Sequence, residues 1–380
     1  MPAENFADAP PNLAVAVLGD VMLDDNVMLG DATRQFDLTT RAKLLGRSSG
    51  LGGAGNVAAN AAGLGLATAL VGMVGDDAHG GRLHGLARAK AGLAQMLFVC
   101  DGLTTPRKLR LYGPHGLTTL IDDEGPPASY YATGRSRRPL LPTPEAVCRH
   151  LADAGVRVFC EVDHGKGFLL DDDSDAFPAS SLRRAVRETG VPVIADPRPC
   201  RNWPYIPGDR VVLKMNHDQL NDVVGVPLGR EFVIPGYHVF PEAEQRTHFA
   251  LVRDAVRASR VIHCDYLWLT YGGAGMSIGP MDGGWSAHLQ AHHGNAVPIE
   301  DLRSDATGCG DTCTAVMAHA IATRGYTAAA VVDGFLYANR AAGLAARHLG
   351  CHVLTKKTFE EVQRGVAEAE DRIRVLANVA

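Results

Sequence analysis

The sequence has no C-x-x-C pair, no internal repeat and no excess of positive charge. Without paired cysteines we expect neither a zinc site nor a disulfide framework, which suits a reducing cytoplasm. The net charge of −5 and pI near 6.3 leave no electrostatic footprint for nucleic acid, so nucleic acid is not an expected partner. With 46% hydrophobic and 21% charged residues over 380 positions, the chain is typical of a globular protein and not of a disordered or fibrous one.

Two segments bear on export and membrane insertion, the N-terminal twelve residues and the uncharged stretch from Leu51 to Gly75. Residues 1–12 are acidic and contain prolines, so they are neither a signal nor a transit peptide, and we predict a disordered tail. Leu51 to Gly75 carries no charged residue and is long enough for a membrane helix, but it contains Asn56, Asn60 and many glycines. We predict a soluble helix followed by a buried strand there, and no membrane partner.

Short apolar runs alternate with helix-forming stretches along most of the chain. The expected helices include Asn56 to Leu64 and Asp77 to Ala89. The expected buried strands are Ala14 to Leu18, Ala67 to Val74, Val156 to Cys160, Val191 to Ala195, Arg210 to Leu213 and Tyr266 to Leu269. This alternation predicts an α/β fold, a doubly wound and mainly parallel sheet flanked by helices.

A second kind of pattern interrupts this alternation. Residues Val27 to Arg47 are polar and alternating, and Lys108 to Ile121 resembles a hairpin with a Gly-Pro-His-Gly turn. We predict a small β lid over residues of about 25–48 and 105–123, within one domain spanning residues 13–380. Residues 226–247 are expected to form an irregular surface insertion.

The segment Asp305 to Thr312 joins a glycine-rich turn to a carboxylate at the start of a predicted helix, Thr312 to Ala322. The first turn of a helix carries unpaired N–H groups, and Gly308 and Gly310 let the preceding backbone converge on an anion. This pattern indicates phosphoryl transfer, with Asp311 accepting a proton from an attacking hydroxyl. On this motif alone, Asp311 as a simple helix N-cap stays open.

A dinucleotide-binding fold is the main competitor. Gly50 to Gly55 satisfies G-x-G-x-x-G, and Asp76 follows at about the distance of the ribose-binding acid, roughly 20 residues on. That fingerprint should follow directly on a buried strand, whereas Leu45-Gly46-Arg47-Ser48-Ser49 precedes it here. We therefore rank a dehydrogenase below a kinase.

The chain resembles the ribokinase-like (PfkB) carbohydrate kinases over most of its length. Asp305 to Asp311 is similar to the family signature D-T-x-G-A-G-D, and Gly52-Gly53-Ala54-Gly55-Asn56 is similar to G-G-x-x-N. Thr270 to Gly275 is similar to the nucleotide loop T-x-G-x-x-G, and Asn216 to Gln219 stands where the family has N-x-x-E. The resemblance implies an ATP-dependent sugar kinase that uses Mg²⁺, and it also suggests K⁺ as a cofactor.

Three positions depart from the family pattern. Ala306 and Cys309 replace Thr and Ala, but the anion cradle uses backbone donors, so we expect the chemistry to survive. Gln219 replaces the glutamate that helps to organise magnesium, and an amide brings no negative charge. Magnesium affinity is then expected to fall, or Asp218 to substitute. This departure keeps a catalytically weak sugar or nucleotide sensor as an alternative.

The resemblance assigns roles to individual positions. For catalysis it implies Asp311 as base, with backbone donors from Gly308, Cys309 and Gly310. For the substrate it implies Asp24, Gly52, Gly53, Asn56, Lys108, Arg110, Asp163 and Lys166. For ATP it implies Lys214, Asn216, Thr270, Gly272, Gly275 and Asn339. Gln219 would hold Mg²⁺ through a water, and Asp305 a monovalent cation. Two alternatives stay open, namely Asp20 in place of Asp24 as the sugar ligand and Asn56 as a helix N-cap.

Four local strings resemble the bacterial heptose-7-phosphate kinases: Gly19 to Asp24, Lys108 to Arg110, Asp163 to Gly167 and Ala338 to Gly343. This narrower resemblance implies transfer to the anomeric hydroxyl of a heptose 7-phosphate, in a kinase domain without a fused nucleotidyltransferase. Lys108, Arg110 and Lys166 would hold the distal phosphate, or would be ordinary surface cations. Residues 34–40 lack the S-P-E-A-P-like string of those kinases, so ribose, fructose and nucleoside kinases remain alternatives. The lid is an expected surface for a homodimer.

Overall fold

The computed structural model describes residues 12–34, 40–100, 102–114, 116–125, 143–169, 179–197, 205–220, 241–260, 262–292 and 305–367. The predicted tail over residues 1–12 lies outside this part of the chain except for Asn12. Residues 35–39, in the string that separates the chain from the heptose kinases, and residues 226–240 of the predicted 226–247 insertion also lie outside it. Residues 242–247, which were expected to be irregular, form the start of a helix.

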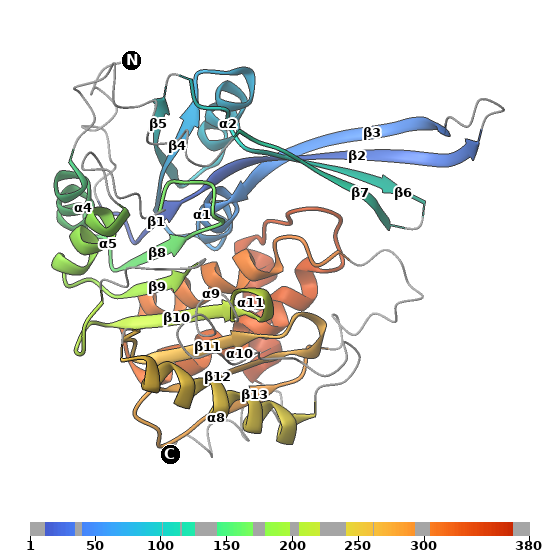
Figure 1. Ribbon diagram of the computed structural model, residues 1–380. Coiled ribbons are helices and arrows are strands. Elements are labelled where there is room, and N and C mark those ends of the chain that lie inside the picture. Colours follow the sequence, from blue (N-terminus) through green and yellow to red (C-terminus); the bar gives the residue numbers. More distant parts are fainter. Residues whose placement is uncertain are drawn as a thin grey trace.

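A nine-stranded sheet forms the centre of the molecule, in the order β13-β12-β11-β10-β9-β8-β1-β4-β5 (Figure 1). Its strands are β1 (Val15–Gly19), β4 (Thr68–Gly75), β5 (Leu93–Cys100), β8 (Val158–Val162), β9 (Val193–Asp196), β10 (Val211–Asn216), β11 (Tyr266–Thr270), β12 (Met276–Pro280) and β13 (Ala287–Leu289). All neighbours pair in parallel except β11 with β12 and β12 with β13. Strands β1, β4, β8 and β9 are buried throughout, as expected for a parallel sheet covered on both faces. The predicted doubly wound α/β fold is confirmed.

Helices cover both faces of this sheet (Figure 1). One hydrophobic cluster joins the sheet to α1 (Ala54–Gly63), α2 (Ala78–Arg88), α9 (Cys309–Arg324), α10 (Ala328–Ala345) and α11 (Lys356–Ala367). The other joins it to α4 (Pro144–Asp153), α5 (Ala179–Glu188) and α8 (Glu242–Ser259). A single turn, α6 (His217–Leu220), follows β10, and a 3₁₀ turn, η3 (Gly272–Ala274), follows β11. None of the helices in the described ranges combines the length and the apolar composition that a membrane crossing requires.

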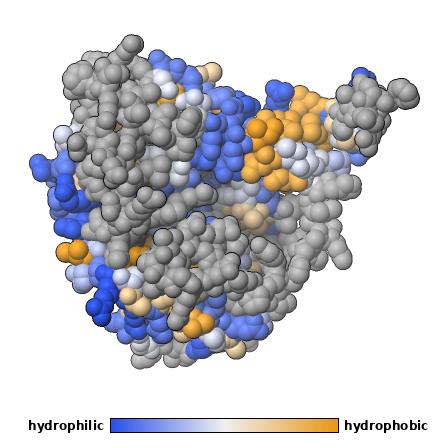
Figure 2. Space-filling view, in the orientation of Figure 1, coloured by the Kyte–Doolittle hydropathy of each residue, from blue (hydrophilic) through white to orange (hydrophobic). Residues whose placement is uncertain are grey.

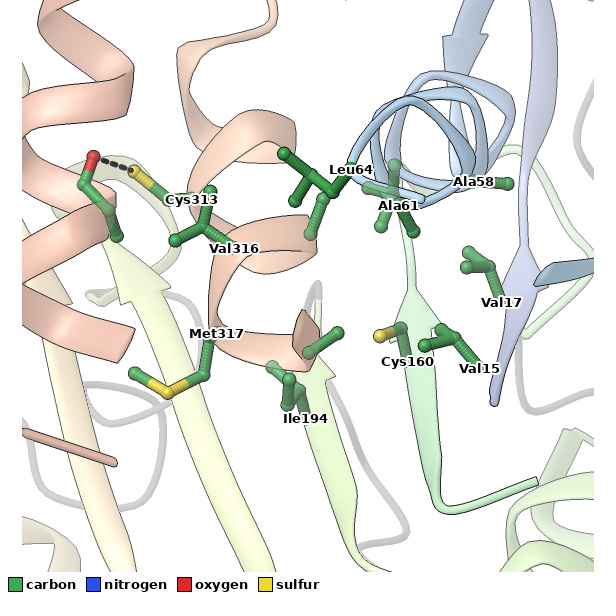
Figure 3. Packing of buried hydrophobic residues seen from close by; sticks show 14 of the residues in the cluster. Val15, Val17, Ala58, Ala61, Leu64, Cys160, Ile194, Cys313, Val316 and Met317 are labelled. Carbon is green, nitrogen blue, oxygen red and sulfur yellow. Dashed lines mark hydrogen bonds between the residues drawn. The ribbon is translucent and has the colours of Figure 1, made fainter. Parts of the chain in front are cut away.

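Helices α1 and α9 lie side by side on β1, β8 and β9 (Figure 3). Both helices are rich in small residues, with the sequence AGNVAANAAG in α1 and CGDTCTAV at the start of α9. Small side chains let two helices approach closely, so both helices can begin at the same edge of the sheet. This packing brings the starts of two segments together although they are about 250 residues apart in the sequence, as the pair Asn56 and Asp311 shows (|i−j| = 255).

A separate four-stranded sheet, β3-β2-β6-β7, projects from the body as a long arm (Figure 1). It contains β2 (Val21–Arg34), β3 (Thr40–Gly53), β6 (Arg107–Gly113) and β7 (Gly116–Asp123). Strand β2 begins before the predicted lid segment of residues 25–48, and β3 ends after it. Asp24 therefore lies in a lid strand. Figure 2 shows exposed apolar surface on this arm, and Leu44, Leu45, Leu117, Leu120 and Ile121 are each more than 40% exposed.

Candidate active site

The carboxyl ends of the central strands lie level with one another. Gly19 of β1 pairs with Val162 of β8, which pairs with Asp196 of β9, and Asn216 of β10 pairs with Thr270 of β11. The chain runs from β1 to one side through β4 and β5 and to the other side through β8 and β9, so the order reverses between β1 and β8. Ligands of open α/β sheets bind at the carboxyl ends of the strands at such a reversal.

Asp20, directly after β1, anchors the loop that follows β8. Its buried carboxylate accepts the backbone N–H groups of His164 (2.8 Å), Lys166 (2.9 Å) and Phe168 (3.0 Å). Burial raises the pKa of Asp20, the neighbouring Asp163 adds to this, and the N–H donors oppose it. Both oxygens are thus held by backbone N–H groups, which cannot turn away as a side chain can, and this argues against Asp20 as the sugar ligand.

Asp24 has a different environment. Its Oδ1 lies 2.9 Å from the guanidinium of Arg110, and its Oδ2 accepts a hydrogen bond from the thiol of Cys351 at 2.7 Å. A side chain at Gly52 would come within 2.8 Å of the Asp24 carboxyl carbon, so glycine is required there for Asp24 to lie against the backbone. Gly53, next in the chain, has φ +58 and is the N-cap of α1.

Asn56 and Asp311 meet at the adjacent starts of α1 and α9. The Asn56 amide donates a 2.8 Å hydrogen bond from Nδ2 to Oδ2 of Asp311, and both residues are buried. Helix α9 begins at Cys309, with Gly308 as its N-cap, so Asp311 is its third residue and not the cap. Asn56 is likewise inside α1. Both N-cap alternatives are therefore wrong, and the two side chains face one another.

Gly308 makes this contact possible. Its φ of 75 lies in the left-handed region, and a Cβ there would come within 2.6 Å of Asn56 Nδ2. Gly310 does not have this conformation, because it lies in the first turn of α9. The N–H of Cys309 donates to the carbonyl of Ala306, whereas the helix provides no acceptor for the N–H groups of Gly310 and Asp311.

Burial raises the pKa of the Asp311 carboxyl, because removal from water disfavours its charge. The neighbouring His164, the Asn56 hydrogen bond and Lys214 oppose this shift, and Asp196 adds to it. A carboxylate whose pKa lies above its usual range is a better proton acceptor than an ordinary surface aspartate.

Lys214, Asp196 and Gln219 form a buried polar cluster beside Asp311. Lys214 Nζ lies 2.5 Å from Asp196 Oδ2, and Gln219 Nε2 donates to Asp196 Oδ1 at 2.9 Å. Burial acts to lower the pKa of Lys214, but the adjacent Asp196 outweighs it and the pKa is raised, so the lysine stays charged. Gln219 also accepts from the N–H of Asn216, and Asn216 Oδ1 accepts from the N–H of Gln219, both at 2.8 Å. The N-x-x-Q segment is thus a capping box at α6, with the amide of Gln219 engaged on both sides.

The Thr270 to Gly275 segment forms a tight glycine loop after β11. Gly272 and Gly275 have φ values of +57 and +110, and the Tyr271 N–H donates to the Gly275 carbonyl at 2.8 Å. Gly272 has open space where a side chain would project. On α10, Asn339 donates to the carbonyl of Gln290 at 2.9 Å, and its buried Oδ1 has no hydrogen-bond partner among the described residues.

The remaining predicted substrate residues are held by protein partners. Asp163 accepts from the Gly165 N–H at 2.8 Å and from Arg183 at 3.0 Å, so its carboxylate shapes its own loop. Lys166 pairs with Glu124, and Lys108 lies 3.9 Å from Asp122. Of these three side chains, only the two lysines retain solvent contact.

Asp305 sits between the lid and the end of α10. Its carboxylate accepts from the Tyr112 hydroxyl (2.5 Å), the Gly350 N–H (2.8 Å) and the Thr307 N–H (2.9 Å). Burial acts to raise its pKa, but the hydrogen bonds from Thr307, Tyr112 and Gly350 outweigh it and lower the pKa. A monovalent cation would have to replace one of these donors to reach an Asp305 oxygen.

The Gly50 to Gly55 segment does not have the structural context of a dinucleotide-binding fingerprint. Gly50 to Gly53 end β3, an antiparallel lid strand, and not a parallel strand of the central sheet. Asp76 is exposed after β4. The glycines instead let α1 begin close to Asp20, whose carbonyl accepts the Ala54 N–H at 2.9 Å.

Three residues at the site were not predicted from the sequence: Asp196, His164 and Cys351. Asp196 could have been suspected, because it is a charged residue directly after an apolar run. His164 lies within Asp163 to Gly167, one of the strings that resemble the heptose kinases, but no local pattern marks it as a site residue. Cys351 carries no sequence signal, since only the folded chain brings it to Asp24.

No protein-family model matches the chain. Among curated proteins, it is similar to the bifunctional protein HldE of Methylobacillus flagellatus, with 27% identity over 365 residues, 94% of this chain and 65% of that protein. It is also similar to HldE of Bradyrhizobium diazoefficiens, with 29% identity over 354 residues, 90% of this chain and 61% of that protein. The chain thus spans less than two thirds of the length of these relatives.

Among solved structures, Arabidopsis thaliana ribokinase complexed with ribose and ATP matches with a TM-score of 0.60 and 18% identity, over 93% of this chain and 99% of the ribokinase. At this identity the match shows the fold alone. Together with the HldE homology, it confirms the resemblance to the ribokinase-like carbohydrate kinases.

Proposed function

From this ribokinase-like fold and HldE homology, we propose that the chain is a carbohydrate kinase that transfers the γ-phosphoryl group of ATP to a sugar hydroxyl. The observation that carries the proposal is the 2.8 Å hydrogen bond between Asn56 and Asp311. It joins the sugar-binding signature to the catalytic signature across 255 residues. Neither an N-cap nor a structural turn requires these two side chains to face one another.

In the proposed reaction, Asp311 accepts the proton of the attacking hydroxyl as its oxygen bonds to the γ-phosphorus, and the bond from that phosphorus to the bridging oxygen breaks so that ADP leaves. The N–H groups of Gly310 and Asp311, at the positive end of α9, stabilise the charge on the transferred phosphoryl group. Asn56 orients the Asp311 carboxylate, and the raised pKa of Asp311 favours proton acceptance. Asp24 holds a pair of sugar hydroxyls, with Arg110 and the Cys351 thiol keeping its carboxylate in place.

For ATP, the donor set fits a nucleotide at the ends of β10 and β11. Thr270 and Asn216 end adjacent strands at the same level, and the glycine loop beside them leaves room for phosphates. The orphaned Asn339 Oδ1 is a buried acceptor that suits the amino group of an adenine. Lys214, held charged by Asp196, provides a cation for the phosphate chain.

Magnesium fits less closely. Within the described ranges no cluster of three His, Cys, Asp or Glu residues could hold a metal ion, so Mg²⁺ would be bound mainly by ATP phosphates and waters. Asp196, through a shared water, is the carboxylate that could contribute, and Gln219 holds it by a hydrogen bond. When bound, the ion would neutralise charge on the phosphate chain.

The proposed acceptor is a sugar phosphate, most consistently a heptose 7-phosphate reacting at the anomeric hydroxyl. Lys108 and Lys166 lie on or beside the lid and would exchange their carboxylate partners for the distal phosphate. Arg110 would stay on Asp24 and reach the phosphate with its remaining N–H donors. Closure of the lid would exclude water from the reaction. The apolar side chains on the arm support a homodimer through the lid, in which a second copy covers Leu44, Leu117 and Ile121.

The decisive test is ADP release from ATP and Mg²⁺ with a panel of sugars and sugar phosphates. We expect turnover with a phosphorylated sugar and not with its unphosphorylated form. Turnover with free ribose, fructose or a nucleoside would contradict the proposed sugar-phosphate acceptor and identify another one. Binding without turnover across the panel would favour the sensor suggested by Gln219. Size-exclusion chromatography with light scattering tests the homodimer, and a monomer would exclude it.

A further inference from the structure

One side chain at the site has no part in the function proposed above. His164 follows β8, at the reversal of strand order, and its backbone is fixed by the Asp20 carboxylate. Its Nε2 lies 3.9 Å from Asp311 Oδ1, is buried, and has no hydrogen-bond partner among the described residues. The ring also packs against the sugar signature, since a Cβ at Gly53 would come within 3.0 Å of His164 Cδ2.

The two oxygens of Asp311 therefore have different neighbours. Asn56 donates to Oδ2 at 2.8 Å, and the imidazole faces Oδ1. A buried imidazole nitrogen without a hydrogen-bond partner costs desolvation energy. Such nitrogens are unusual in folded proteins, so each one calls for an explanation. A proton on Nε2 would complete a pair with Oδ1, and a histidine exchanges that proton near neutral pH.

We propose, on the basis of the kinase function above, that His164 is a positioning residue for Asp311: its protonated imidazole pairs with Oδ1 and keeps the carboxylate ionised and oriented toward the acceptor hydroxyl. Asn56 cannot replace it, because an amide orients the carboxylate without adding charge. The His164 side chain is 27% exposed and can itself exchange protons with solvent. It therefore offers a route by which the proton that Asp311 takes from the hydroxyl reaches solvent.

The other charged and titratable groups around the pair oppose or complement this role. Lys214 from β10 is a second cation near Asp311, and Asp196 from β9 is a like charge. The thiols of Cys309 and Cys313 on α9 and of Cys351 after α10 lie close enough to Asp311 to feel its charge. Burial raises the pKa of each thiol above 9, so they are uncharged at neutral pH. Besides Asp311, His164 has Asp20 as an acidic neighbour.

The first test needs no substrate. The pKa of the His164 imidazole is measured by NMR titration in the wild-type chain and in Asp311→Asn. In Asp311→Asn the opposite charge 3.9 Å from Nε2 is gone, so the imidazole should hold its proton less tightly than in the wild type. An unchanged His164 pKa in Asp311→Asn would overturn the pairing, whatever the chain catalyses.

The second test uses the pH profile of kcat/KM. In His164→Gln the acid limb should move to higher pH by about one unit, because the cation that keeps Asp311 ionised is gone. His164→Lys restores a permanent charge and should bring the limb back. His84→Gln, at a half-buried histidine that faces Gln95, is the matched control and should leave the profile unchanged. An acid limb in His164→Gln that coincides with the wild type would overturn the proposal. A wild-type chain without turnover would instead overturn the proposed kinase function, and the NMR titration would still decide the pairing.

Discussion

Gly308→Ala is the sharpest single test of the site geometry. A Cβ at this position would come within 2.6 Å of Asn56 Nδ2, whereas an ordinary contact begins near 3.4 Å, so one of the two groups must move by about 0.8 Å. Asn56 cannot yield without disturbing its 2.8 Å hydrogen bond to Asp311. A misplacement of this size is expected to reduce kcat on the order of 10²-fold, because the base no longer meets the acceptor hydroxyl.

The same substitution also has a cost in stability. The φ of 75 at Gly308 places a side chain in the left-handed region, which costs about 1–2 kcal/mol. Loss of a buried hydrogen bond to a carboxylate adds about 1.5–3 kcal/mol. We expect a free energy of unfolding lower by about 2.5–5 kcal/mol in denaturant titration, with kcat measured on the folded fraction.

The matched control lies at the other end of the same helix. Gly325 has a φ of 78, but a Cβ there meets nothing within 4 Å. Gly325→Ala should therefore lose stability from backbone strain and keep the kcat of the wild type. If Gly308→Ala also kept it, or if both variants lost turnover equally, the close approach of Gly308 to Asn56 would not be what positions the base.

Other predictions concern the charged groups. Asp311→Asn should lower turnover roughly 10²-fold or more and leave the ATP Kd in calorimetry nearly unchanged. Because the pKa of Asp311 is raised in the fold, its carboxyl favours the folded state below its unfolded pKa and loses this as pH rises through the folded pKa. Asp311→Asn should therefore raise the Tm at neutral pH, and a fall would contradict the burial argument. For the same reason, wild-type kcat/KM should be lost on acidification at a pH above the ordinary aspartate value of 3.8. Gln219→Glu places a second carboxylate beside Asp196, so the Tm should fall in EDTA and recover with Mg²⁺; equal Tm values in both would refute this. Cys351→Ala should raise the sugar KM about tenfold with little change in kcat, as expected for one hydrogen bond to the Asp24 carboxylate, and Cys351→Ser should restore it.

Local sequence was sufficient where a short segment decides its own conformation. The apolar run at Ala14 to Leu18 and the uncharged segment from Leu51 to Gly75 predicted β1, α1 and β4 within a few residues. Such segments depend on the spacing of apolar residues along the chain, and that spacing is visible in the sequence. The limits appeared where a strand is stabilised by distant partners: the predicted lid began at about residue 25, but β2 already includes Asp24, because β3 and β6 pair with it on both sides.

By itself the sequence determined the order of the elements, the glycine positions at Gly52 and Gly308, and the candidate base Asp311, because each follows from residue type and short spacing. Only the tertiary structure decided how the two aspartates are held: Asp20 by three backbone N–H groups of the loop after β8, and Asp24 by the side chains of Arg110 and Cys351. It alone brought His164 and Asp196 close to Asp311, and Cys351 to Asp24. These contacts join segments from several strands and helices, and their distances depend on how the whole sheet folds, which no local pattern encodes.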